Sequence, residues 1–215
     1  MIREKKCATP PPSLQSKKKY DGQDVIDQLI ADHHGKCYLC ELKVKQHYEV
    51  EHLKSKENHK DLTCEWTNLF LSDGYCNPKK GDRFDEILNP NKKNIEEIIE
   101  QRIDLLNKTA LFSSSNSSHE VQLTIELLNR LFNGTYAPKL RRGRENEFYK
   151  EVERIINEFT QTLYNYSLNS TPETEKAVRD ELSIDKELLG FKYWIIKDRP
   201  ELFAVFGNDI KWNKQ

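Results

Sequence analysis

The residue types with the most chemical capability lie close together, between positions 37 and 82. This stretch contains a thiol pair, an acid-histidine pair, an isolated asparagine and a Cys-Asn-Pro-Lys-Lys-Gly segment: Cys37-x2-Cys40, Glu51-His52, Asn68 and Cys76–Gly81. Hydrolysis of a phosphodiester needs a water nucleophile, a base that deprotonates the water, and a cation that neutralises charge on the phosphate and the leaving oxygen. The stretch therefore predicts a metal-dependent site that hydrolyses phosphodiesters.

His52 and Glu51 are the residues that we expect to act on the water and on the cation. Imidazole titrates near neutrality, so His52 is the expected general base. Adjacent side chains on a strand point to opposite faces, so a bend or a strand edge is needed for Glu51 to hold metal while His52 faces the water. Asn77 is the expected second oxygen ligand, because hard cations such as Mg²⁺ prefer oxygen donors. Its alternative role is that of an N-cap before Pro78, which suits a first helical position.

Asn68 is the expected organiser of the site. It precedes the apolar run Leu69–Leu71, a position that is also typical of a turn residue. We predict that its amide bridges backbone groups across the loop that carries His52 and so fixes the imidazole. In this account His52 and Asn68 are the catalytic residues, and Glu51 and Asn77 hold a divalent cation, Mg²⁺ or Mn²⁺.

The cysteines predict a second metal site. Cys37 and Cys40 form a two-ligand knuckle, and Cys76 would add a third thiolate to a tetrahedral Zn²⁺. A second Cys-x2-Cys would require a cysteine at position 73, where the chain has Asp73. Carboxylates also bind zinc, so three thiolates plus Asp73 is our first prediction, and the role would be structural because a small module needs such a link. The alternative fourth ligands are Cys64 and His47; without any fourth ligand, the thiols would simply be buried.

Three basic residues follow Asn77 and are candidates for nucleic-acid binding: Lys79, Lys80 and Arg83. Cations in a first helical turn oppose the helix macrodipole, so helix stability does not explain Lys79 and Lys80. Contact with the phosphates of a DNA backbone would explain them. The alternative is a basic face that is merely solvated.

Periodicity predicts the elements that position these residues. Apolar residues at helical spacing predict helices over 22–34, 95–106, 121–132 and 148–163. Alternating residues predict a β-hairpin within 41–52 that ends at His52, and a short helix begins at Asn77-Pro78. The aromatic residues from about 189 onward either cap the core or bury into a partner.

The distribution of residue types divides the chain into three parts. All five cysteines and five of the six histidines precede residue 77, and helical patterns dominate later. We expect an extended basic and Pro-rich arm (1–21), a catalytic module (22–92) and a helical module that binds a partner (93–215).

The composition limits the class of protein. The formal net charge of the 215 residues is −1, so any contact with phosphate must come from local patches rather than from bulk attraction. The opening residues lack the apolar region of a signal peptide, and no window approaches the length of a membrane span. Cysteines two residues apart in a reducing compartment favour metal binding over disulfides, so we expect a cytoplasmic protein.

The same residues resemble a known family pattern. HNH nucleases with a ββα-metal core carry an acid-histidine pair, a middle asparagine, and a third-motif His or Asn after a cysteine; the corresponding residues here are Glu51-His52, Asn68 and Asn77. More narrowly, five segments resemble the HNH proteins of bacterial Septu and retron anti-phage systems, the PtuB-like group. They are the Pro-rich start and residues 34–41, 50–52, 65–69 and 76–82, and the similarity is specific over about residues 8 to 90.

The resemblance implies a fold, an activity and partners. The fold would be α+β, a ββα-metal HNH core with a zinc knuckle embedded in a mainly α-helical chain. The activity would be cleavage of DNA within an anti-phage defence complex, with an SMC/ABC-like (PtuA-like) ATPase subunit as partner. Two positions depart from the pattern: Asp73 replaces a cysteine of the fuller zinc pattern, and Asn77 stands in place of His.

A second hypothesis is a non-catalytic adaptor. In it the cysteine knuckle stabilises a binding surface and the helical part docks a partner. The intact Glu51-His52 pair argues against it, because an inactive module has no need to keep both residues. Metal-dependent cleavage separates the two hypotheses.

Overall fold

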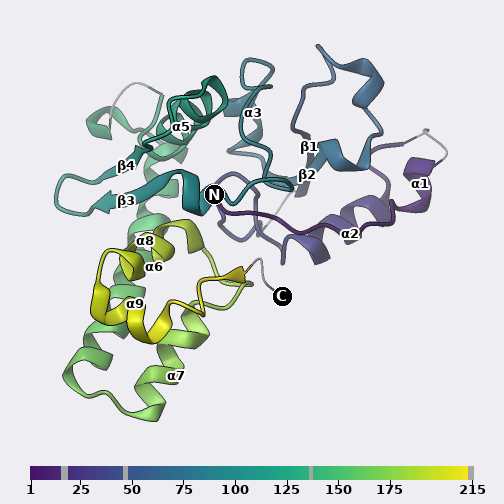
Figure 1. The fold of residues 1–215 in the computed structure, drawn as a ribbon. Coiled ribbons are helices and arrows are strands. Elements are labelled where there is room, and N and C mark those ends of the chain that lie inside the picture. The colour runs from purple at the N-terminus through teal and green to yellow at the C-terminus, as the bar shows by residue number, and fades with distance from the viewer. Residues whose placement is uncertain (16–18, 46–47, 136–137, 213–215) are drawn as a thin grey trace.

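The computed structural model describes residues 1–15, 19–45, 48–135 and 138–212 (Figure 1). The fold is α+β, as the sequence predicts. The helices are α1 (Pro12–Gln15), α2 (Gln23–Asp32), α3 (Asn77–Lys80), α4 (Ile95–Ile98), α5 (His119–Phe132), α6 (Arg144–Leu168), α7 (Pro172–Glu181), α8 (Leu189–Lys197) and α9 (Pro200–Phe206). The strands are β1 (Tyr48–His52), β2 (Leu69–Asp73), β3 (Glu100–Asp104) and β4 (Thr109–Ser113).

Strands β1 and β2 form the antiparallel sheet that carries Glu51 and His52. The register pairs Glu51 with Phe70 and His52 with Leu69. The predicted strand that ends at His52 is confirmed as β1. The predicted hairpin within residues 41–52 is wrong, because β1 pairs with β2. Residues 69–71 are buried throughout, so this strand shows no alternation of polar and apolar residues from which it could be recognised.

The second antiparallel sheet, β3 and β4, replaces a predicted helix. The prediction of one helix over 95–106 is wrong: α4 ends at Ile98, and the chain then continues into β3. Asp104 accepts hydrogen bonds from the backbone and side-chain amides of Asn107 at 2.9 and 2.7 Å, which is local turn chemistry that competes with a helix. Leu106, assigned to the apolar stripe of the predicted helix, is 92% exposed at this turn.

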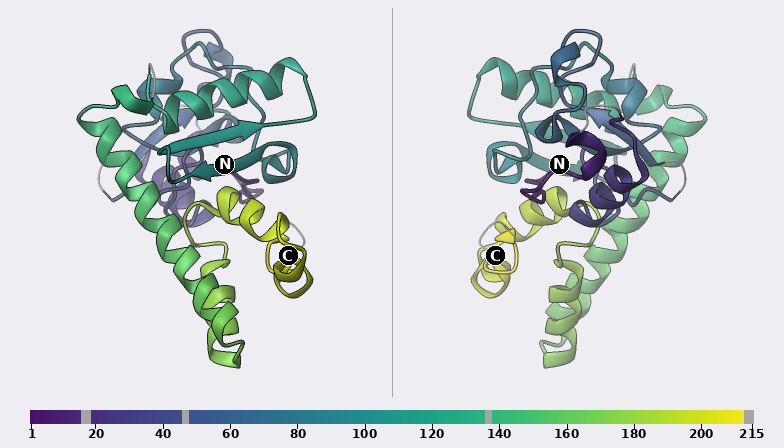
Figure 2. Two further views of the ribbon diagram at one scale, coloured as in Figure 1. Left: turned by 90° about the vertical axis from the view of Figure 1, so that its left-hand side faces the viewer. Right: turned by 90° about the vertical axis from the view of Figure 1, so that its right-hand side faces the viewer.

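The predicted helices over 22–34, 121–132 and 148–163 are confirmed as α2, α5 and α6. Helix α6 has 25 residues, a length of about 37 Å at 1.5 Å per residue. Figure 2 shows it extending from the main body, with α7 packed along its far end. Its first half contributes Val152 and Ile156 to the main core, and its second half contributes Phe159 and Leu163 to a second cluster with α7, α8 and α9.

The main hydrophobic core draws residues from all three predicted parts of the chain. Met1 and Leu14 come from the N-terminal arm, Phe70 comes from the middle part, and Phe132 and Phe191 come from the last part. The arm therefore packs against the body. Neither α6 nor any other helix among the described residues combines the length and the apolar character that a bilayer crossing requires.

Four aromatic residues of the C-terminal region are buried in the core, which is one of the two predicted alternatives, whereas Phe203 is exposed; the four are Phe191, Tyr193, Trp194 and Phe206. Trp194 is buried, and its indole N–H donates to the backbone carbonyls of Glu96 and Ile99 at 2.9 and 3.0 Å. Phe191 lies against Phe112 and Phe132. A truncation that removes residues from 189 onward would therefore expose the core. Any loss of partner binding in such a variant could come from unfolding instead of from a lost contact.

Candidate active site and metal centre

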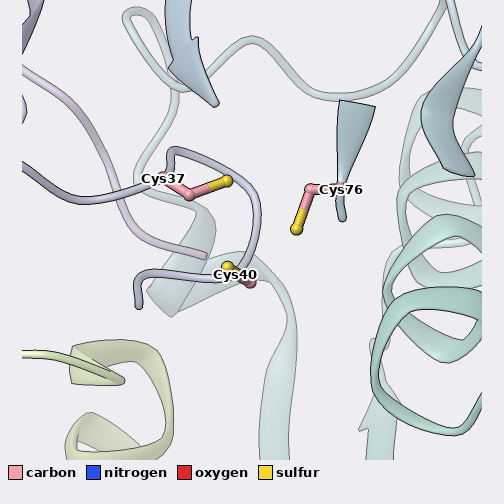
Figure 3. Close-up of side chains that lie close together, drawn as sticks. All are labelled: Cys37, Cys40 and Cys76. Carbon is pink, nitrogen blue, oxygen red and sulfur yellow. The ribbon is translucent and has the colours of Figure 1, made fainter. Parts of the chain in front are cut away.

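Three cysteines form a compact buried cluster (Figure 3). Cys37 and Cys40 lie in the turn after α2, and Cys76 lies directly before α3. The three Sγ atoms lie within 4.8 Å of one another, and none of the thiols is in a disulfide. Tetrahedral zinc with Zn–S bonds of about 2.3 Å separates its sulfur ligands by roughly 3.8 Å, so this spacing suits Zn²⁺.

The three thiols do not ionise together without a cation. Burial raises the pKa of the Cys40 and Cys76 thiols well above the usual range. Burial acts against ionisation of Cys37 too, but hydrogen bonds from the other two thiols hold its pKa well below the usual range. This is the pattern of one thiolate stabilised by two thiols, so three thiolates would require a positive ion between them.

The structure does not place the predicted fourth zinc ligand, Asp73, at the cluster. Among the described residues the cluster contains three ligands, and the Asp73 carboxylate is not one of them. Its Oδ1 accepts from the Tyr75 backbone N–H at 2.7 Å and lies 3.3 Å from the Arg144 guanidinium. Of the alternatives, Cys64 also lies outside the cluster, and His47 falls outside the described residues.

Two substitutions distinguish the ligands. Asp73→Asn is expected to keep the full zinc content of the purified protein, because this carboxylate binds Tyr75 and Arg144 instead. Cys76→Ser is expected to release the zinc, because it removes one of three thiolates. Mass spectrometry of the metal content measures both, and equal loss of zinc from the two variants would make Asp73 a ligand after all.

His52 ends strand β1 with its ring only partly accessible. The residue is 5% exposed, and its Nε2 lies 3.0 Å from the carbonyl oxygen of Thr63. A carbonyl only accepts, so Nε2 carries the hydrogen and Nδ1 keeps the lone pair of a base. Burial lowers the pKa of His52, the Thr63 carbonyl acts in the opposite direction, and Lys56 and Lys80 lower it further. The ring is therefore neutral and able to accept a proton at pH 7.

Asn68 bridges the two ends of the loop that follows His52. Its Nδ2 donates to the carbonyls of Lys54 and Leu62 at 3.0 and 3.2 Å, and its Oδ1 accepts from the Lys54 backbone N–H at 2.8 Å. Thr63, the partner of the His52 ring, directly follows Leu62. The amide thus makes the bridge that the sequence predicts; its contribution to catalysis stays a prediction.

Glu51 and Asn77 engage other side chains. Glu51 Oε1 lies 3.0 Å from the Lys80 ammonium, which leaves Oε2 as the carboxylate oxygen for a cation. Burial raises the pKa of Glu51 to about 7, although Lys80 acts in the opposite direction. Asn77 is the first residue of α3, and its Nδ2 donates to Glu49 Oε2 at 2.7 Å, so its amide does not cap the helix.

One open cavity joins the predicted hydrolytic residues. It has a volume of about 630 Å³, and Glu51, His52 and Asn77 all line it. Its walls come from the sheet, the start of α3 and the segment before α2. A carboxylate, an amide and a neutral imidazole thus border the same solvent-accessible space, which is the donor set that a divalent cation and an attacking water require.

The prediction that Lys80 contacts DNA is wrong. Lys80 is 1% exposed, and its ammonium donates to the carbonyl of His52 at 2.9 Å while pairing with Glu51. Its cation therefore stabilises the end of β1 and is not available on the surface. Lys79 lies 2.6 Å from Glu145, and Arg83, with a side chain that is 61% exposed, pairs with Glu126; phosphate contacts of these two residues stay predictions.

Asp85 is a residue of the site that the sequence did not indicate. Its two oxygens accept from the backbone N–H and hydroxyl of Ser55, both at 2.8 Å, and Oδ2 accepts from Asn58 at 2.9 Å. Lys80 lies 3.8 Å away. Asp85 thus anchors the loop after His52 to the segment after α3, a long-range contact that leaves no spacing signal in the sequence.

Comparison with known proteins adds no relative: no family model and no curated protein matches this chain.

Proposed function

We propose that this protein is a divalent-metal-dependent endonuclease of the HNH type that hydrolyses phosphodiester bonds in DNA. The observation that carries the proposal is the shared cavity, where Glu51, Asn77 and the buried, hydrogen-bonded His52 face the same space. The resemblance of residues 8 to 90 to HNH nucleases supports the same reading. Zinc held by Cys37, Cys40 and Cys76 would be structural.

In this proposal the chain's own residues prepare the water and position the base. Glu51 Oε2 and Asn77 Oδ1 would hold a Mg²⁺ or Mn²⁺ ion, which supplies charge neutralisation at the scissile phosphate and the leaving oxygen. His52 accepts a proton from water at Nδ1, and the Thr63 carbonyl stabilises the imidazolium that forms. Asn68 keeps Thr63 in place through its bond to Leu62.

The wider assignment rests on the resemblance alone. We propose that the protein is the effector subunit of a bacterial anti-phage complex and acts with an SMC/ABC-like ATPase. The net charge of −1 agrees with a nuclease that obtains part of its DNA affinity from a partner.

One contact favours a second candidate, a zinc-stabilised adaptor without catalysis. The Lys80 ammonium already neutralises the carboxylate that the first proposal assigns to a metal ion. In the adaptor, the Glu51–Lys80 pair would only stabilise the end of β1.

Cleavage of supercoiled plasmid by the purified chain, alone and with the ATPase, tests the two candidates. The nuclease is expected to nick or linearise DNA with Mg²⁺ or Mn²⁺ and to be inactive in EDTA. No cleavage with either metal, in a protein that retains its zinc and its fold, would support the adaptor. A parallel RNA substrate shows which nucleic acid is cut.

A further inference from the structure

The wall of the active-site cavity contains a pair of residues to which the proposed mechanism gives no role. Tyr20 lies in the segment before α2, and Lys56 lies in the loop after β1. The Lys56 ammonium donates to the Tyr20 hydroxyl at 3.2 Å and lies 5.2 Å from the centre of its ring. Two segments that are 36 residues apart in the sequence thus meet at the edge of the cavity.

This pair lies directly beside the proposed general base. The rings of Tyr20 and His52 make an edge-to-face contact, with centroids 4.8 Å apart and planes at 66°. His52 is therefore held from two sides, by the Thr63 carbonyl at Nε2 and by the Tyr20 ring. Any group bound by Tyr20 and Lys56 would be a near neighbour of the site of water activation.

The charges around the cavity single out Lys56. Five carboxylates line it, whereas Lys56 is the one Lys or Arg among its described lining residues; the carboxylates are Asp21, Glu49, Glu51, Glu57 and Asp82. Carboxylates repel phosphate, so a phosphodiester can approach only where positive charge compensates. The proposed divalent ion supplies that charge at Glu51 and Asn77, and Lys56 supplies it on the Tyr20 side. The hydrogen bond to Tyr20 raises the pKa of Lys56, so the ammonium stays charged.

We propose that the Lys56 ammonium and the Tyr20 hydroxyl form a binding subsite for a backbone phosphate of the nucleic acid, next to the phosphate that is cleaved. This inference rests on the proposed function, since it names how the same cavity holds its substrate. Lys56 contributes binding of the strand alone, whereas Tyr20 also holds the ring of His52 through its edge contact. The ligand chemistry is a phosphodiester, which the subsite recognises by charge and not by base sequence.

The experiment compares Lys56→Gln with a matched control, Lys54→Gln. Lys54 is exposed and lies two residues away, but it does not line the cavity. Fluorescence anisotropy measures binding of the full chain to a short DNA duplex in Ca²⁺ over a range of KCl concentrations. For Lys56→Gln the slope of the logarithm of the association constant against log[salt] is expected to become shallower by about one unit, because one phosphate contact is lost. Lys54→Gln is expected to keep the wild-type slope.

Kinetics and a tyrosine series sharpen the test. With Mg²⁺ or Mn²⁺, Lys56→Gln is expected to raise KM with little change in kcat, because binding is lost in the ground state and the transition state alike. Tyr20→Phe keeps the ring against His52 but loses the hydroxyl, so its effect on binding should be smaller than that of Lys56→Gln. Tyr20→Ala loses both and should lower kcat as well.

The outcomes separate this inference from the proposed function. Three results would each overturn the subsite. The first is a wild-type slope for Lys56→Gln, and the second is an equal decrease of the slope in Lys54→Gln. The third is no salt-dependent binding of DNA by the wild-type chain. If the wild-type chain cleaves DNA but Lys56→Gln is unaffected, the subsite alone fails. If the slope changes as expected but no metal supports cleavage, the nuclease proposal fails and the phosphate subsite stands.

Discussion

Replacing His52 by glutamine is expected to lower the rate of phosphodiester cleavage by roughly 10²- to 10⁴-fold, the usual contribution of a general base. The glutamine amide nitrogen lies as many bonds from Cα as Nε2 of histidine, so it can still donate to the Thr63 carbonyl and keep the anchor of the loop after β1. Glutamine has no nitrogen that accepts a proton near pH 7, so only the base is removed. Plasmid cleavage under single-turnover conditions measures the effect, and His52→Ala should lose at least as much activity.

The matched control is His119→Gln. His119 is exposed at the start of α5, pairs with Glu86, and lies outside the cavity, so its replacement should leave cleavage unchanged. Thermal melting of both variants checks that the fold is intact. Full activity of His52→Gln in a folded protein would end the assignment of this residue as the base.

Removal of zinc is expected to cause the largest loss of stability. If free zinc exceeds the dissociation constant by 1,000-fold, binding contributes about 4.1 kcal/mol to the free energy of unfolding. A loss of about 4 kcal/mol lowers the melting temperature of a chain of this size by about 8 to 16 °C. Cys37→Ser should have a similar effect, because the cluster connects the turn after α2 to the start of α3. Calorimetry with and without a zinc chelator measures the shift.

Cys7→Ser serves as the control for the cysteine substitutions. Cys7 is exposed and does not belong to the cluster, so this change should affect neither zinc content nor melting temperature. A protein that contains no zinc as purified, and whose melting temperature is the same with and without added zinc, would contradict a structural metal. The three thiols would then be buried cysteines only.

The sequence predicted the parts of the site that depend on local spacing. Two thiols separated by two residues can share one turn, and this brought Cys37 and Cys40 within reach of a single ion. The role of Asn68 in bridging the loop was also predictable, because an amide just before a buried strand can reach backbone groups on both sides of that loop. Apolar periodicity likewise predicted α2, α5 and α6.

What the sequence could not predict depends on long-range packing. Lys80 follows Lys79 directly, yet the first is buried against Glu51 while the second reaches Glu145 on α6, and no local pattern distinguishes the two lysines. Asp73 matched the spacing of a fourth ligand, but Arg144 lies beside its carboxylate, 71 residues away in the chain. Tyr20 lines the same cavity as His52 because the arm packs against the body, although the sequence of the arm predicted an extended segment.

The most direct test is a crystal structure of the chain soaked in Mn²⁺, with anomalous scattering used to locate the ion. We expect one Mn²⁺ in the cavity between β1 and α3, bound by Glu51 and Asn77 oxygens at about 2.0 to 2.3 Å. We also expect a water on the ion within hydrogen-bonding reach of the His52 ring. A cavity without Mn²⁺, with Glu51 still paired to Lys80, would contradict the hydrolytic site and leave the cysteine cluster as the candidate metal centre.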